Sequence, residues 1–402
     1  MKHSVTRWLA AWSRPASRWF FGLLVLLLGL WLAPAETSGE GAGMVVDICP
    51  AAALQTRPSI FQTGGIILTT FDRDSLWVYD IDRKRRYPLP ETAPCGQNCH
   101  LSPDFRWITY FNNATNTYNK MRLDGTERSM LVEYAGDVEW WSPDTLLIWT
   151  PGHSAYLREE NGTQRDYLPV NGVISVQPGG FWGLAVEPID NGFKRALINL
   201  RQRGLPDTPE QRIELGPEIP YFSASSWSPD GRWFAYVAPG AFDDTVLMHG
   251  SEIYGVRPGE TAPMQWTRLT ERYGATRING RSVGSLSWSP DGTRIAFWVT
   301  ELTGRNPATD TGDAVIHIYD LNQQEVRRYC GYSTIEHTPE PPRLVWSPDG
   351  THLAFGGNIP DDDLGYLLLA LNVETGVFTI LSDGIYPALG TADVIAWGLP
   401  PR

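Results

Sequence analysis

The chain of 402 residues contains 12% aromatic residues, with 17 Trp, 39 Gly and 31 Pro, whereas charged residues account for only 19%. This composition is typical of a large all-β protein with many turns, and it excludes a helical bundle or a disordered chain. The formal net charge of −12 argues against nucleic acid as a partner and against binding to an anionic membrane surface.

Residues 1–35 have the features of a secretory signal peptide. Four basic residues and no acidic ones accompany an apolar run over 19–32, and Ala33-Pro34-Ala35 places small residues where a signal peptidase cleaves. Removal of this segment would change the net charge from −12 to −16. The run is shorter than the about 20 residues of a membrane span, but an uncleaved N-terminal membrane anchor remains the alternative. We therefore expect an extracytoplasmic protein: secreted, periplasmic or on the outer face of the membrane.

Residues 36–59 are rich in Gly, Ala, Thr and Pro and are predicted to form a linker or strap. The chain contains four cysteines. An even number in an exported chain favours disulfides, and we expect the pairs Cys95–Cys99 and Cys49–Cys330. The segment from Cys95 to His100 also resembles a stretched haem-attachment motif, but a disulfide is the preferred interpretation.

A five-residue word, Trp-Ser-Pro-Asp-Gly, recurs along the chain. Full copies occupy 227–231, 288–292 and 346–350. Shorter copies begin at Leu101 and Trp141, and a degenerate copy covers 176–180. Their prolines lie 35 to 61 residues apart, which is typical of a repeat protein. Pro presets the first corner of a turn, Asp can bond to its own backbone, and Gly supplies a positive φ. Each word therefore predicts a tight turn between two strands.

The same succession of predicted strands follows each word. Aromatic and β-branched runs come directly after the turn, as in 233–237 and 294–298, and further strands follow, as in 315–320 and 326–329. Each unit is thus predicted to be a sheet of four antiparallel strands. Since one such sheet cannot bury both of its faces alone, the copies are expected to pack around an axis as a β-propeller.

The two ends of the repeat region complement each other. Residues 66–70 and 76–80 are predicted to be middle strands without an inner strand before them, whereas 393–398 is predicted to be an inner strand with nothing after it. The C-terminal strand is therefore expected to complete the first blade and close a ring over residues 60–398. Seven blades follow from the inner strands near Leu101, Trp141, Val176, Trp227, Trp288, Trp346 and Trp397. Six blades are the alternative, because the copy at Val176 is degenerate.

The word, followed by a strand of the Ile-Ala-Phe type, resembles the TolB-like, WD-repeat-like propeller family over most of residues 60–398. This resemblance implies a propeller outside the cytoplasm. The family includes periplasmic proteins that bind other proteins, propeller domains of prolyl-oligopeptidase-type peptidases and some sugar-acid lyases. The resemblance therefore implies no single function.

The predicted loops between second and third strands are rich in Asp and Asn and are expected to surround one face of the ring. Carboxylate oxygens are the ligands that Ca²⁺ prefers, so the candidate calcium ligands are Asp310, Asp313, Asp361 and Asp363. The same charges could instead attract a basic partner. The simplest alternative is that these loops bind nothing and contain Asp and Asn only because these residues favour turns.

Two further patterns carry weaker indications. Residues 280–284 match the Gly-x-Ser-x-Gly pattern of hydrolases, but they precede a predicted propeller strand rather than a helix, so the match is interpreted as accidental. The histidines show no metal-binding spacing, although His100, His153 and His337 fall near loops that could face the central channel.

These observations favour a binding or scaffold protein that contacts a protein or carbohydrate ligand through one loop face. No catalytic residue is assigned. The alternative function is an enzyme that acts on polysaccharides or sugar acids, a lyase or glycosidase, with its site at the propeller channel.

Overall fold

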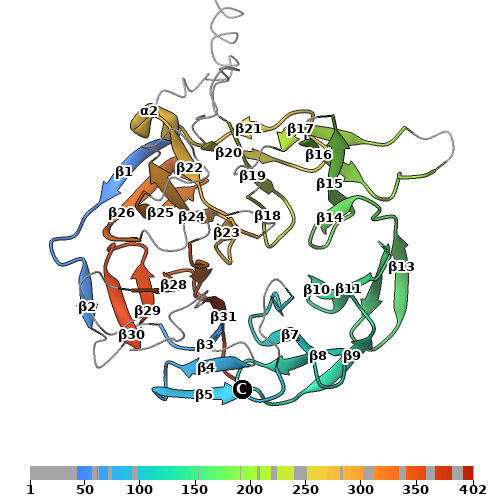
Figure 1. Cartoon of the computed structure of the whole chain (residues 1–402), viewed down its shortest axis with the longest axis horizontal. Helices are drawn as coiled ribbons and strands as arrows, with labels where there is room; N and C mark the ends of the chain where they lie inside the picture. Colours follow the sequence, from blue (N-terminus) through green and yellow to red (C-terminus); the bar gives the residue numbers. More distant parts are fainter. Residues whose placement is uncertain are drawn as a thin grey trace, which may run out of the picture. The chain divides into compact units, whose positions relative to one another are not determined.

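Seven β-sheets surround a central axis in the computed structural model (Figure 1). The structure describes residues 43–56, 61, 63–70, 75–92, 98–152, 154–190, 192–205, 209–218, 224–239, 251–280, 284–301, 312–334, 341–358, 367–382 and 393–401. All of these belong to one unit, Gly41–Arg402, and the other unit, Met1–Glu40, lies outside the described residues. Within the described part, no helix is both long enough and apolar enough to cross a membrane.

Blades one to four each contain four antiparallel strands, which follow one another from the axis outward. Blade one consists of β31 (Val394–Gly398), β3 (Ile66–Thr70), β4 (Leu76–Asp80) and β5 (Arg85–Leu89). Blade two consists of β6 (His100–Leu101), β7 (Trp107–Asn112), β8 (Thr117–Arg122) and β9 (Ser129–Glu133). Blade three consists of β10 (Asp137–Ser142), β11 (Thr145–Thr150), β12 (Ser154–Glu159) and β13 (Gln164–Leu168). Blade four consists of β14 (Val173–Val176), β15 (Trp182–Ile189), β16 (Gly192–Asn199) and β17 (Arg212–Glu218).

Blades five to seven follow the same plan with additions. Blade five consists of β18 (Ser225–Trp227), β19 (Phe234–Pro239), β20 (Ser251–Val256) and β21 (Met264–Gln265). Blade six consists of β23 (Ser287–Trp288), β24 (Arg294–Glu301), β25 (Ala314–Asp320) and β26 (Glu325–Thr334), and β22 (Thr276–Ile278) also pairs with β24. Blade seven consists of β27 (Val345–Trp346), β28 (His352–Gly357), β29 (Leu367–Asn372) and β30 (Phe378–Ser382). A short helix, α2 (Leu269–Tyr273), precedes β22.

The ring is closed by strands from opposite ends of the described chain. β31 pairs antiparallel with β3, in the register Ile66 to Gly398 and Ile67 to Trp397. The Trp397 indole donates a hydrogen bond to the Gly64 carbonyl at 3.0 Å. The prediction of seven blades with a C-terminal closing strand is therefore confirmed.

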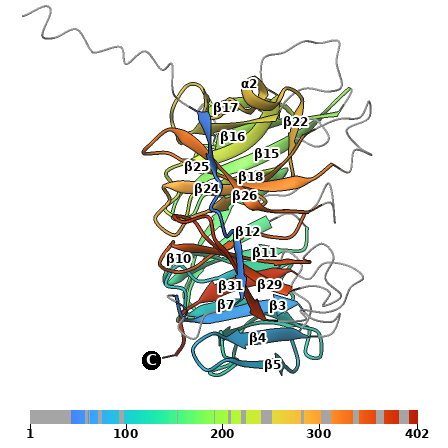
Figure 2. The same cartoon turned by 90° about the vertical axis from the view of Figure 1, so that its left-hand side faces the viewer.

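Two strands before blade one extend the outer edges of blades six and seven. β1 (Met44–Ile48) pairs parallel with β26, and β2 (Leu54–Thr56) pairs parallel with β30. Figure 2 shows this segment crossing the outside of the ring, and a disulfide joins Cys49 to Cys330 on β26. The segment thus covers two sheet edges that would otherwise expose unpaired backbone groups.

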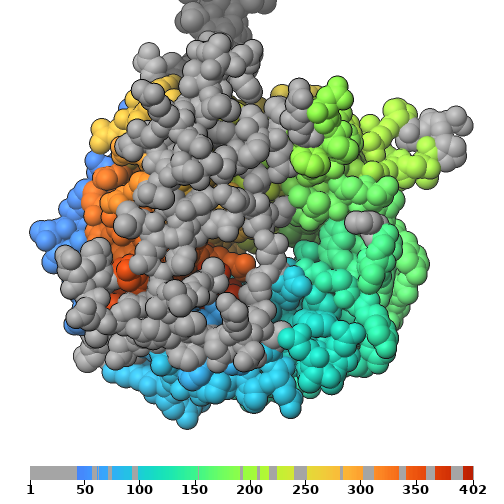
Figure 3. Space-filling view, viewed as in Figure 1, coloured from blue at the N-terminus to red at the C-terminus, as the bar shows by residue number. Residues whose placement is uncertain are grey.

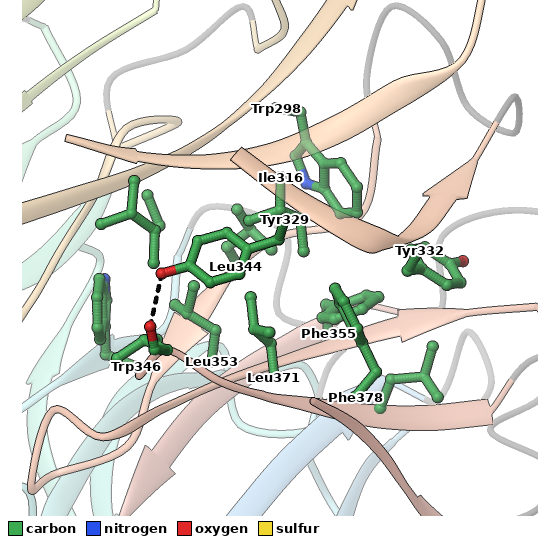
Figure 4. Packing of buried hydrophobic residues seen from close by; sticks show 14 of the residues in the cluster. Trp298, Ile316, Tyr329, Tyr332, Leu344, Trp346, Leu353, Phe355, Leu371 and Phe378 are labelled. Atoms are coloured by element: carbon green, nitrogen blue, oxygen red, sulfur yellow. Dashed lines mark hydrogen bonds between the residues drawn. The ribbon is translucent and has the colours of Figure 1, made fainter. Parts of the chain in front are cut away.

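The hydrophobic core is divided among the seven seams between neighbouring blades, with one buried cluster in each. In the space-filling view, blades two to four follow one another along the rim (Figure 3). Figure 4 shows the seam between blades six and seven, where Trp298 and Tyr332 face Phe355 and Phe378. The buried Tyr329 hydroxyl donates to the Val373 carbonyl at 2.7 Å in this seam. Each sheet therefore buries both faces only because its neighbours are present, as the repeat pattern predicts.

Candidate functional site in the central channel

The repeated turns are held by one hydrogen-bond network. In each full copy the Ser hydroxyl, which is completely buried, donates to the Asp carboxylate and accepts from the backbone N–H five residues after it. That second contact measures 2.9 Å for Ser228 with Trp233, for Ser289 with Arg294 and for Ser347 with His352. The Gly of each copy has a φ of 67–68°, a conformation that a side chain disfavours. The word is therefore a rigid turn in which Ser carries as much of the geometry as Pro and Gly.

The same hydrogen bonds perturb the aspartates of the turns. Burial acts to raise the pKa of Asp230, Asp291 and Asp349, but hydrogen bonds from the Ser hydroxyl and from the backbone outweigh it. The pKa of each is therefore lowered, and the carboxylates stay charged in the turn.

Blade four reproduces this network with a different side chain. Gln177 stands where the full copies have Ser, and its Oε1 accepts from the Trp182 N–H at 3.2 Å. The Gln177 N–H donates to the Trp182 carbonyl at 2.8 Å, as the Ser residues do in the other turns. The degenerate copy thus still forms a blade, which explains why the ring has seven blades rather than six.

The tryptophans before the turns connect neighbouring blades. In blades six and seven the indole N–H donates to a carbonyl on the inner strand of the preceding blade: Trp288 to Ser226 at 3.3 Å and Trp346 to Ser287 at 2.9 Å. The buried indole N–H of Trp227 in blade five makes no such contact among the described residues. In blade three this role falls to Trp140, which donates to His100 at 3.2 Å. These contacts fix the spacing of the inner strands around the channel.

The inner strands and turns of six blades enclose a cavity of about 680 Å³. Its lining includes turn residues such as Pro143, Pro229 and Pro290, and also Gly284 and Arg343, which precede inner strands. Small-molecule sites commonly have volumes of roughly 300–1,000 Å³. The cavity is therefore large enough for a sugar unit or a short peptide segment.

Three titratable side chains meet in the wall of this cavity. Asp137 and Glu139 are two residues apart on β10, so strand geometry places them on the same face. His100 comes from β6 of the preceding blade, and its Nε2 lies 3.0 and 3.1 Å from the two Asp137 oxygens. One ligand atom from each of the three residues lies within 4.8 Å of the others. Among the described residues, this is the one such group that combines a histidine with carboxylates.

The surrounding residues hold the three side chains in place. The Trp149 indole on β11 donates to Glu139 Oε1 at 2.6 Å, and the Val138 N–H donates to Asp137 Oδ1 at 2.7 Å. Thr109 on β7, fully buried, donates to the Val138 carbonyl at 2.9 Å and accepts from the His100 N–H at 3.3 Å. The blade two to blade three seam therefore orients the cluster before any ligand arrives.

Charge and burial set the protonation of the cluster. Burial acts to lower the pKa of His100, but the charge and hydrogen bond of Asp137 outweigh it, so the pKa of His100 is raised. Burial, with help from the charge of Asp137, raises the pKa of Glu139. Arg343, another residue of the cavity lining, opposes the protonation of His100. The wall thus presents both signs of charge at short range.

Several solved structures are similar to this chain. TolB from Acinetobacter baumannii is 16% identical, with a TM-score of 0.41, over 82% of this chain and 81% of that one. A candidate TolB from Agrobacterium tumefaciens is 16% identical, with a TM-score of 0.39, over 80% and 90%. The propeller domain of the Trilobed protease from Pyrococcus furiosus is 10% identical, with a TM-score of 0.50, over 84% and 99%. This last structure supports the propeller fold that the strand order shows.

Those identities support the fold alone. No protein-family model and no curated protein matches the chain. The function of this propeller therefore has to be argued from its own side chains.

The candidate calcium ligands are only partly within the described residues. Asp310, Asp361 and Asp363 lie outside them. Asp313 precedes β25, and its Oδ2 accepts a hydrogen bond from Ser333 at 3.1 Å. The calcium site stays a prediction.

Of the cysteines, Cys49 and Cys330 form the disulfide that attaches the N-terminal strands to blade six. Cys99 is disulfide-bonded and so is not available for haem attachment, whereas its expected partner Cys95 lies outside the described residues. Ser282 of the hydrolase-like pattern, His153 and His337 also lie outside them.

The sequence pointed to His100 but missed Asp137 and Glu139. A signal for the pair was present, because alternate acidic residues directly precede Trp140 in a predicted inner strand. The packing of that strand against the blade that supplies His100 could not be predicted from the sequence.

Proposed function

We propose that the protein is an extracytoplasmic binding protein that receives a ligand, a protein segment or a carbohydrate, at the channel mouth formed by the Ser-Pro-Asp turns. The observation that carries this proposal is the cavity of about 680 Å³ enclosed by the inner strands and turns of six blades. Its mixed lining of indoles, carboxylates, His100 and Arg343 suits a ligand with both apolar and polar groups.

The rigidity of the mouth supports a binding role. Turns with buried Ser hydroxyls and indole contacts between blades leave little of the lining to be ordered when a ligand binds. Preorganised sites bind more tightly because less conformational entropy is lost on association. The Cys49–Cys330 disulfide supports an oxidising compartment, in agreement with the predicted signal peptide.

The proposed face differs from the one favoured by the sequence. The acidic loops connect second and third strands, whereas the cavity lining includes the turns between first and second strands. Most of the acidic residues expected to form a calcium site lie outside the described residues. The channel mouth therefore carries the proposal, and the acidic loops remain a second surface to test.

A second candidate function is an enzyme acting on sugar acids or polysaccharides. One observation favours it: the His100–Asp137 pair and Glu139 gather in the cavity wall, as acid–base chemistry at a channel would require. Binding ranks first because the cavity supports it without further assumptions about reactivity.

The experiment blocks the channel with a bulky side chain. Ser287 lies on β23 and lines the cavity, so S287W should fill it. S129W on the exposed outer strand β9 is the matched control. Melting temperatures are measured with panels of neutral and acidic oligosaccharides and extended peptides, because a ligand of the folded state raises stability by mass action.

A ligand that stabilises the wild type and S129W but not S287W supports the channel as the binding site. Two results would refute the channel as the binding site. One is a ligand that stabilises all three proteins equally; the other is that no member of the panels stabilises the wild type. New products in the same mixtures, analysed by mass spectrometry, would favour the enzyme instead.

A further inference from the structure

We infer that His100, Asp137 and Glu139 form a binding site for a divalent transition-metal ion of the zinc class in the wall of the channel. The inference is independent of the proposed function, because it concerns the metal alone. It begins from the distances: one donor atom from each residue lies within 4.8 Å of the other two. Ligands of a tetrahedral zinc ion are bonded at about 2.0–2.2 Å, so only small side-chain movements are needed to surround an ion.

The donor set selects the class of metal. Imidazole nitrogen is a good ligand for zinc, nickel and copper, whereas Ca²⁺ takes six to eight oxygen ligands. Here one imidazole and two carboxylates from three residues provide a mixed nitrogen and oxygen set. Three protein ligands with one further position for water or a ligand are the arrangement of open zinc sites.

The cluster is accessible from the channel. The side chains of His100 and Asp137 are 27% and 22% exposed, and His100 and Glu139 contribute to the cavity lining. An ion could therefore enter without opening the seam between blades. The further coordination position would face the cavity, where an oxygen atom of a bound molecule could occupy it.

Each ligand has an atom for the metal and a partner that orients it. Trp149 binds Glu139 Oε1, which leaves Oε2 for the ion. The Val138 N–H binds Asp137 Oδ1, which leaves Oδ2. His100 is fixed through its backbone, because its carbonyl accepts from Trp140 and its N–H donates to Thr109. Such outer partners are a regular feature of metal sites and raise their affinity.

The present contacts also explain what the ion would replace. In the metal-free protein His100 Nε2 faces both Asp137 oxygens within hydrogen-bond distance. A metal ion bound to Nε2 would take the place of this hydrogen bond, and the imidazole would coordinate as the neutral base. The ion would also offset the repulsion between two neighbouring carboxylates.

The test is calorimetric titration of Zn²⁺ into purified protein freed of metal by chelation, repeated with Co²⁺ while its visible absorption is recorded. We expect one ion per chain for the wild type. H100Q and E139Q should weaken binding by about 100-fold or more, while W149F, which removes only an outer partner, should weaken it by roughly 10-fold. E127Q alters an exposed glutamate paired with Arg122 and should bind like the wild type.

Several outcomes decide the matter. Stoichiometric Zn²⁺ binding that is lost in H100Q and E139Q but kept in E127Q supports the site, as does a Co²⁺ spectrum of a four- or five-coordinate ion. Equal affinities in all variants, absence of saturable binding, or Ca²⁺ competing as well as Zn²⁺ would overturn it. Circular dichroism and melting curves establish that each variant is folded; should E139Q fail to fold, W149F and H100Q carry the test.

Discussion

Removal of the Cys49–Cys330 disulfide should lower the stability of the whole ring. The bond joins residues separated by 281 positions, so it closes a loop that includes almost all the blades. The loop-entropy relation gives about 6 kcal/mol for a loop of this length. For a folded unit of the size of Gly41–Arg402, that corresponds to a fall in Tm of roughly 7 °C.

Without the disulfide, the loss of structure should begin at β1. β1 is held by a parallel ladder with β26, and of its apolar side chains only Val45 and Ile48 pack against the core, where they are partly buried, while Met44 and Val46 are exposed. In a C49S/C330S variant, β1 should therefore detach before the blades unfold. Hydrogen exchange of the β1 amides should accelerate strongly under native conditions, while those of β29 stay protected.

The assays are thermal and urea unfolding, with hydrogen-exchange mass spectrometry, of the wild type and C49S/C330S. A variant whose Tm lies within about 1 °C of the wild type would refute the loop-entropy argument. Unchanged exchange in β1 would refute the claim that the disulfide, rather than the strand ladder, holds this segment.

Three further predictions concern buried polar groups, each measured by urea unfolding. S289A removes a buried hydroxyl that accepts from a backbone N–H, so it should cost about 1–3 kcal/mol. W346F keeps an aromatic ring but loses the hydrogen bond to the Ser287 carbonyl, so about 1 kcal/mol should be lost. Burial lowers the pKa of His317 to about 4, against about 6.5 when unfolded. The unfolded state therefore binds the extra proton, and stability from this residue is complete above pH 6.5 and falls by about 3 kcal/mol towards pH 4. An H317Q variant should lack that part of the acid sensitivity. If the free energy of unfolding fell equally steeply with pH in the two proteins, the lowered pKa of His317 would be contradicted.

The fold could be predicted from the sequence because its determinants are local and repeated. Pro and Gly of the word impose a turn wherever they occur, and the runs after the turn favour strands. Closure could also be predicted, since 393–398 lacked following strands and 66–70 lacked a preceding one. The number of blades was harder, because Gln177 replaces Ser in blade four with a longer side chain that makes the same backbone contact.

The channel cluster could not be predicted because it forms between blades. Asp137 and Glu139 share a face for reasons that the sequence contains, but their approach to His100 depends on how two sheets pack. The indole of Trp140 sets that packing through the His100 carbonyl. In blade three a register shift between Trp140 and Ser142 lets Trp140, rather than the Trp next to Ser142, make this contact.

The pairing of β31 with β3 has a consequence for biosynthesis. The outer strands of blade one end at Leu89, and the inner strand that completes the sheet begins at Val394, about 300 residues later. At roughly 5–20 residues per second, the ribosome needs about 15–60 s to supply it. During that time the apolar strand Ile66–Thr70 has no partner on its inner edge. Until β31 is made, the inner edge of this sheet therefore exposes unpaired backbone groups that can pair with another chain.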